Sequence, residues 1–243
     1  MNTRIKLTMI LLILSAPLAA RDANSIVEAA DKYRGFKGSF AQQSTAVYYK
    51  NDKEESSTNL KVYINDNRNS LVRFMGPGRD KGQIMLMSGN NIWMYIPGTR
   101  NPIRLSPQQR LLGQASNGDV ARTNYSDDYN AELDGEEKVE NINCHRLILT
   151  ANEPDTTYQK IVYFVKKTDN RPVKALFYAK SGKLLKTGYF KKPGTFLGRT
   201  ILRELHLYDE LKKNEKTVIK VEKITREKLP ASHFNYKYLP RIR

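Results

Sequence analysis

The sequence has very little cysteine. Cys144 is the only cysteine among 243 residues, which excludes an intramolecular disulfide and leaves the hydrophobic core as the source of stability. Its surroundings, ENINCHRLILT, alternate polar and apolar residues. This period of two predicts a β-strand with a buried thiol.

Residue patterns typical of catalytic and metal sites are also scarce. The three histidines, His145, His206 and His233, lie far apart, and none has the i, i+4 spacing of a helical metal pair. His145 follows Cys144, but neighbours on a strand point to opposite faces, so the two cannot act as nucleophile and base. No nucleophile elbow and no zinc-ligand spacing is present. We therefore predict no enzyme, no metal and no cofactor; a secreted hydrolase is an alternative that a convergent cluster of nucleophile, histidine and aspartate would support.

Two further polar motifs are predicted to be turns. The segment GPGRDKG, residues 76–82, lacks the GK[ST] ending of a phosphate loop and leads into a strand-like segment, so a hairpin connection is expected. Asp127 and Asp128 lie in a turn-like context and are expected to be solvated rather than to form an acid and base pair.

Only one long apolar run exists. It extends from Leu7 to Leu14, after the basic residues Arg4 and Lys6 and before small residues that end at Ala20. This pattern predicts a secretory signal peptide, residues 1–20, cleaved near Ala20, and residues 21–243 as one exported domain. No later segment approaches the roughly 18 apolar residues of a transmembrane helix.

Acidic residues are outnumbered: 25 Asp and Glu face 41 Lys and Arg, a formal charge of +16. Such a balance favours anionic partners, and outside the cytoplasm these are membrane surfaces rather than nucleic acid. The alternative is that many lysines only solvate strand faces and protect sheet edges, as in KIVYFVKK.

The pattern that dominates the chain is alternation. Ile26, Val27, Ala30 and Tyr33 predict one opening amphipathic helix, capped by Asp22 or Asn24. After it, a dozen period-two segments follow one another, separated by turns rich in Gly, Asn and Asp, such as MSGNN, LDGEE, TDNRP and KSGK. The predicted fold class is mainly β, with one long, curled antiparallel sheet.

One segment interrupts this alternation. Ser106, Pro107 and Gln109 have the spacing of a capping box with proline at the first helical position, and Gly113 could end the helix. A short helix is therefore expected after Ser106, with a second one starting near Gly118.

A curled sheet closed by two helices can hold a ligand cavity. Alternation and the charge of Arg73 predict which residues face it, although the face of Trp93 stays open. On this interpretation Met85 and Met87 face a covering element or a partner, since methionine repacks easily; gap-filling core methionines are the alternative. The predicted cavity residues are Leu60, Val62, Ile64, Val72, Phe74, Ile84, Leu86, Trp93, Leu111 and Leu112.

Several stretches are similar to one known family. They are YRGFKGSFAQQ, LKVYINDNRNSLVRFM, GNNIWMYIP, GPGRDKG, QQRLLGQASNGDVARTNYSDDY and SGKLLKT. Through these stretches the chain resembles the LolA/LolB superfamily of lipoprotein carriers, in the branch of outer membrane lipoprotein-sorting proteins. The resemblance spans essentially the whole chain after the signal peptide.

The resemblance implies a half-open barrel with a helical lid, located in the periplasm of a Gram-negative bacterium. It implies binding of lipoprotein acyl chains or another lipid without a covalent step, with an inner-membrane transporter or an outer-membrane acceptor as partner. Arg68, in NDNRNSL, matches the arginine that contacts the lid, although Asn69 replaces the proline that follows it in the carrier. A non-transporting adaptor of a lipid exporter is the second interpretation.

Overall fold

The computed structural model describes residues 16–242 except residues 67, 77, 79, 123 and 211. Most of the predicted signal peptide, residues 1–15, lies outside the described residues. The described chain consists of one short and one longer α-helix, fifteen strands and two 3-10 helices. Their bounds are α1 Ala16–Asp31, β1 Phe40–Lys50, β2 Lys53–Asp66, β3 Asn69–Gly76, β4 Ile84–Ser88, β5 Asn91–Tyr95, β6 Ile103–Leu105, β7 Arg110–Leu112, β8 Ala115–Ser116, α2 Asn117–Ala121, β9 Tyr129–Val139, β10 Ile142–Ala151, β11 Lys160–Lys166, β12 Pro172–Tyr178, β13 Leu184–Phe196, β14 Arg199–Asp209, β15 Glu215–Thr225, η1 Ala231–Phe234 and η2 Tyr236–Arg241.

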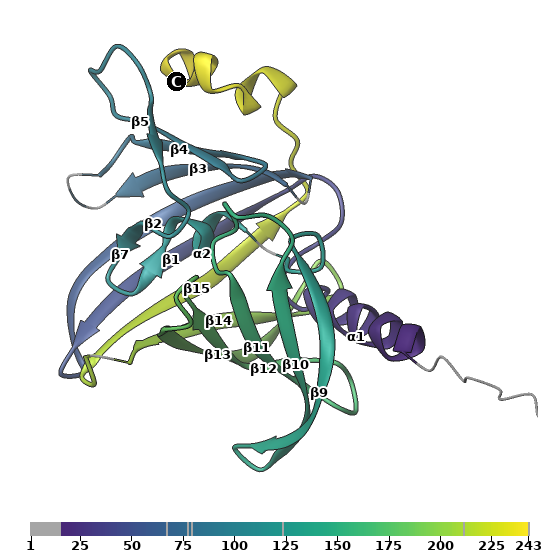
Figure 1. Cartoon of the computed structure of the whole chain (residues 1–243). Coiled ribbons are helices and arrows are strands. Elements are labelled where there is room, and N and C mark those ends of the chain that lie inside the picture. Colours follow the sequence, from purple (N-terminus) through teal and green to yellow (C-terminus); the bar gives the residue numbers. More distant parts are fainter. Residues whose placement is uncertain are drawn as a thin grey trace, which may run out of the picture.

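Thirteen strands form one antiparallel sheet in the order β6-β5-β4-β3-β2-β1-β15-β14-β13-β12-β11-β10-β9. The sheet curls into a half-barrel, but its edge strands β6 and β9 do not pair, so it is not closed (Figure 1). The predicted fold class, a curled and unclosed antiparallel sheet with few helices, is confirmed. Cys144 is fully buried on β10, as the alternation around it predicts.

Helix α1 packs through the apolar face that the sequence predicts. Ala23, Ile26, Val27 and Ala30 are at most 6% exposed and join the main core. The helix begins at Ala16, before the predicted caps, and the Asn24 carboxamide oxygen instead accepts a hydrogen bond from the Ala131 amide at 2.9 Å. This bond ties α1 to the edge strand β9. No helix of the described part of the chain is long and apolar enough to cross a membrane.

The predicted helix after Ser106 is wrong. The Gln109 amide does donate to the Ser106 carbonyl at 3.1 Å, which closes one turn, but the chain then enters the β7–β8 hairpin. Gly113 forms this hairpin turn at φ +52°, and a Cβ there would lie 2.3 Å from Thr217 Oγ1. A left-handed, tightly packed glycine favours a turn over the end of a helix. The second predicted helix, near Gly118, is confirmed as α2.

The two faces of strands β3 to β5 belong to different cores. The concave face contributes Val62, Val72, Phe74, Met85 and Met87 to the main core of the half-barrel. The convex face carries a second cluster, in which Ile84, Leu86 and partly buried Trp93 pack against residues of the C-terminal 3-10 helices. In Figure 1 these helices lie over the outside of this part of the sheet.

The predicted orientation of Ile84 and Leu86 is therefore wrong, and Trp93, whose face the sequence leaves open, lies on the convex side with them. Val72 pairs directly with Met85, and directly paired residues share a face, so the methionines point inward. Polarity could not decide between the faces because the C-terminal segment covers the outer one. Trp93 stacks on Tyr236 of that segment, with ring centroids 4.2 Å apart. An external covering element, the C-terminal segment, is confirmed, but it covers Ile84 and Leu86 instead of the two methionines.

The C-terminal 3-10 helices are expected to stabilise the fold by covering the outer face of the sheet. Leu239→Ala removes a fully buried side chain from the outer cluster and should lower the free energy of unfolding by about 2–5 kcal/mol. Urea denaturation measures this change, with Leu197→Ala, at a side chain 48% exposed, as the control that should change little. A Leu239→Ala protein as stable as the control would contradict the packing described.

Candidate functional site

The candidate site is the concave interior of the half-barrel and the segment that covers it, residues 106–128, here called the lid segment. It comprises the β7–β8 hairpin, α2 and the turn before β9. Ala115, Val120 and Ala121 of the lid segment are buried in the main core, and Leu111 and Leu112 pack against it. The lid segment thus fills the mouth of the half-barrel with small and branched side chains.

The predicted cavity residues divide between the two faces. Those that face the concave interior or pack against its core are Leu60, Val62, Ile64, Val72, Phe74, Leu111 and Leu112. Ile84, Leu86 and Trp93 lie on the convex side. Met85, Met87, Ile92 and Met94, which the prediction placed elsewhere or left out, belong to the interior.

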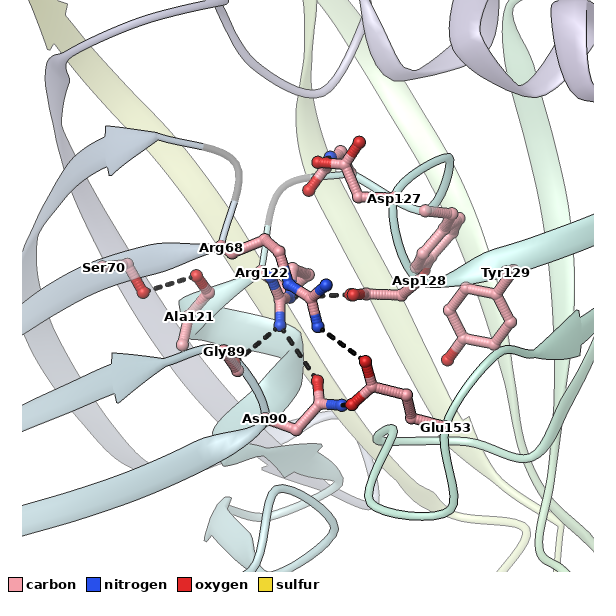
Figure 2. Close-up of polar contacts among 12 residues, drawn as sticks. Arg68, Ser70, Gly89, Asn90, Ala121, Arg122, Asp127, Asp128, Tyr129 and Glu153 are labelled. Atoms are coloured by element: carbon pink, nitrogen blue, oxygen red, sulfur yellow. Dashed lines mark hydrogen bonds and ion pairs between the residues drawn. The ribbon is translucent and has the colours of Figure 1, made fainter.

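A buried ion pair within the lid segment positions an arginine that contacts the β4–β5 turn. The Arg122 guanidinium pairs with the Asp128 carboxylate at 2.9 Å and donates to the Gly89 carbonyl at 2.9 Å (Figure 2). Their side chains are only 6% and 4% exposed, so the expectation that Asp128 is solvated is wrong. Burial lowers the pKa of Arg122 and raises the pKa of Asp128, each against the attraction of its partner. Removing one member would leave the other charge uncompensated.

A second buried cluster holds α2 to the opposite side of the sheet. The Lys186 ammonium of β13 donates to the Gln114 carbonyl at 2.7 Å and pairs with Asp119 at 2.5 Å. Asp119 also accepts from the Ser116 amide and from the Tyr158 hydroxyl, both at 2.8 Å. Burial lowers the pKa of Lys186, and the attraction of Asp119 opposes that shift. The charges of this cluster are thus paired inside a water-poor interior.

Further polar contacts complete the attachment of the lid segment. The Ser70 hydroxyl of β3 donates to the Ala121 carbonyl at 2.7 Å, and the Gln114 amide donates to the Thr217 hydroxyl at 2.8 Å. The Asp31 carboxylate, at the end of α1, accepts from the amides of Tyr125 and Ser126. The lid segment is therefore held largely by polar groups over an apolar interior.

Arg68, the predicted lid contact, lies beside this cluster. Its guanidinium pairs with Glu153 at 3.2 Å, with side chains 43% and 52% exposed, and its charge acts on the pKa of Arg122 (Figure 2). Glu153 also accepts from the Asn90 side chain, at 2.6 Å. The role of Arg68 in holding the lid remains a prediction. Arg122, which the sequence interpretation does not single out, is the buried arginine that contacts the β4–β5 turn.

Two small cavities lie in the interior of the described part of the chain. Between α2 and strands β13 to β15 lies a cavity of about 60 Å³, and a neighbouring one measures about 10 Å³. A pocket for a small organic ligand usually measures about 300–1,000 Å³. The larger hollows of the described chain lie at its polar surface, for example one of about 460 Å³ between α1 and the turn before β9. An apolar chain could enter the interior only if the lid segment moves.

Comparison with known proteins agrees with this architecture. A LolA superfamily protein of Nitrosomonas europaea is 35% identical and superposes with a TM-score of 0.83, over 89% of this chain and 98% of that one. The chain belongs to the LolA superfamily. A family model described only as an uncharacterized protein matches residues 66–241. None of the curated proteins matches the chain in sequence.

Two more distant structures share the fold. An outer membrane lipoprotein-sorting protein domain of Vibrio parahaemolyticus is 19% identical, with a TM-score of 0.75, over 91% of this chain and 100% of that one. A DUF1329 family protein of Desulfovibrio piger is 20% identical, with a TM-score of 0.76, over 91% and 99% of the two chains. The half-barrel and its lid segment are therefore set in a fold that recurs at low sequence identity.

Proposed function

We propose that this LolA superfamily protein is a periplasmic carrier that shields acyl chains of lipoproteins or other lipids and delivers them toward the outer membrane. The observation that carries the proposal is an unclosed half-barrel whose apolar interior is covered by a lid segment attached largely through polar contacts. The lipoprotein-sorting domain with the same fold supports it. The proposal includes export by the signal peptide, an inner-membrane transporter or outer-membrane acceptor as partner, an anionic membrane surface for the basic chain, and no catalytic step.

The free energy expected for burying an acyl chain is compatible with reversible binding. Burying about ten methylenes at about 0.8 kcal/mol each yields roughly 8 kcal/mol, which corresponds to micromolar affinity before other terms. Opening the lid segment subtracts from this amount because buried charges must separate or meet water. Because this cost weakens the net affinity for the acyl chain, the protein can release the chain to a partner that binds it more tightly.

A non-transporting adaptor is the second candidate. The small interior cavity of about 60 Å³ favours it, because an adaptor needs a filled barrel and no room for cargo. The two functions differ in whether the delipidated protein takes up an acyl chain.

Acyl uptake tests the proposal. Protein from the periplasm of a Gram-negative host is extracted and its lipids are identified by mass spectrometry; the delipidated protein is then titrated with a fluorescent fatty acid. We expect uptake, weakened by Met85→Gln in the interior but not by Leu86→Gln, at a neighbour on the outer face. Both side chains are at most 1% exposed, so the variants are matched in burial. Absence of both extracted lipid and uptake would favour the adaptor.

A further inference from the structure

Arg34 is a buried cation inside the half-barrel, beside Tyr125 of the lid segment. It follows α1, and its side chain is 9% exposed. Its guanidinium lies 3.7 Å from the centroid of the Tyr125 ring and 5.7 Å from that of Phe190. Arg34 lines both interior cavities.

The hydrogen-bonding capacity of Arg34 is largely unused. A guanidinium carries five N–H donors, yet among the described residues the side chain makes one hydrogen bond, to Asp31, at 3.5 Å. Asp31 is already engaged by the amides of Tyr125 and Ser126 at 2.8–3.0 Å. By contrast, Arg122 and Lys186 each have a close carboxylate partner.

Among the described residues, the other carboxylates of this cavity already have cationic partners. Two carboxylates line the same cavity, but Asp119 pairs with Lys186, and Glu204 pairs with Lys192 at 3.0 Å. Gln42 adds a second underused group: it is 7% exposed, its amide nitrogen donates to Ser44, and its carbonyl oxygen makes no hydrogen bond among the described residues. Arg34 and Gln42 thus both offer unused hydrogen-bonding groups to this cavity.

Besides these polar groups and two further arginines, Arg122 and Arg203, the walls of this cavity are apolar. The apolar part comprises Val120, Phe190, Leu202, Leu205, Ile219 and Val221. A space of about 60 Å³ suits a head group of a few atoms but not a tail. Val120 belongs to α2, so movement of the lid segment would extend the space along this apolar wall.

From this arrangement we infer that Arg34 binds the anionic head, carboxylate or phosphate, of an amphiphile whose tail lies in the half-barrel interior. The inference rests on the proposed carrier function and narrows its cargo to anionic lipids or fatty acids. A bidentate, charge-assisted contact from guanidinium to carboxylate or phosphate explains why arginine occupies this position. The lipid end of a lipoprotein carries no such charge, so it would be the poorer ligand.

Amphiphiles that share the same tail but differ in their head groups test the inference. The delipidated wild-type protein is titrated by calorimetry with dodecanoate, dodecyl phosphate and the neutral monododecanoyl glycerol, and separately with acetate and inorganic phosphate. We expect the anionic amphiphiles to bind at least about tenfold more tightly than the neutral one. Weaker binding of acetate and phosphate alone would assign the site to a lipid head; equal or tighter binding would assign it to the free anion and overturn the lipid assignment.

Substitution of Arg34 completes the test. Arg34→Gln should abolish the preference for anionic heads, Arg34→Lys should restore part of it, and Arg100→Gln, which removes an exposed charge, should leave it intact. Equal wild-type affinity for anionic and neutral heads overturns the inference without any variant, even if Arg34→Gln fails to fold. Binding of no amphiphile at all refutes the carrier function itself, and the inference with it.

Discussion

Arg122→Met should lower the free energy of unfolding by about 3–5 kcal/mol, because it leaves the Asp128 carboxylate buried without its cation. The variant also loses the hydrogen bond from the guanidinium to the Gly89 carbonyl, which joins the lid segment to the β4–β5 turn. We therefore expect acyl uptake to become faster as stability falls. Urea denaturation measures the first effect, and stopped-flow fluorescence of a fatty acid probe measures the second.

A double variant separates the ion pair from general damage. Arg122→Met with Asp128→Leu removes both charges and should recover much of the lost stability, since apolar replacement of a buried pair is often close to neutral. Arg146→Met breaks partly exposed pairs with Asp134 and Glu137 and should cost at most about 1 kcal/mol. Equal losses in the Arg122 and Arg146 variants would show that Arg122 does not hold the lid segment.

Oxidation of the double variant Ser70→Cys and Ala121→Cys should reduce acyl uptake at least about tenfold, because the disulfide prevents the lid segment from opening. The Ser70 hydroxyl lies 2.7 Å from the Ala121 carbonyl oxygen, so the two positions are neighbours across the lid and β3. Cys144 is the only native cysteine and is buried, so the engineered pair has no competing thiol at the surface. Reduction should restore uptake in the same sample.

Two controls accompany the cross-linking experiment. Each single cysteine variant should take up lipid at a rate independent of oxidant. The oxidised double variant should be more stable by about 2–4 kcal/mol, which shows that the bond forms without distortion. Undiminished uptake by a fully oxidised and stabilised protein would mean that lipid does not enter beneath the lid segment.

Alternation in the sequence predicts the sheet because each strand has one buried face. It fails where both faces are buried: Ile84 and Met85 are equally apolar, and only the register with β3 decides which one points inward. The C-terminal 3-10 helices have no strong periodicity, so their cover of the outer face was not foreseen. The β7–β8 hairpin was mistaken for a helix since the capping signal at Ser106 is local and the close packing of Gly113 is not.

The polar residues of the site were harder to predict because burial of a charge depends on its partner. Arg122 and Asp128 lie in a segment rich in polar residues, where solvation is the usual expectation. Lys186 did leave a signal: it shares strand parity with Gly188 and buried Phe190, which places a lysine on the inward face. Such inward charges on an otherwise apolar strand face are useful markers of a lid contact.

Photolabelling with a dodecanoate that carries a diazirine near its tail end tests the central claim most directly. After irradiation of the loaded protein, tandem mass spectrometry locates each adduct. We predict labels on Val72, Met85, Met87 and Val120, which line the interior or its lid. Labels confined to Ile84, Leu86 or Trp93 on the outer face, or no label on a protein that binds the probe, would contradict the claim that the half-barrel interior takes the acyl chain.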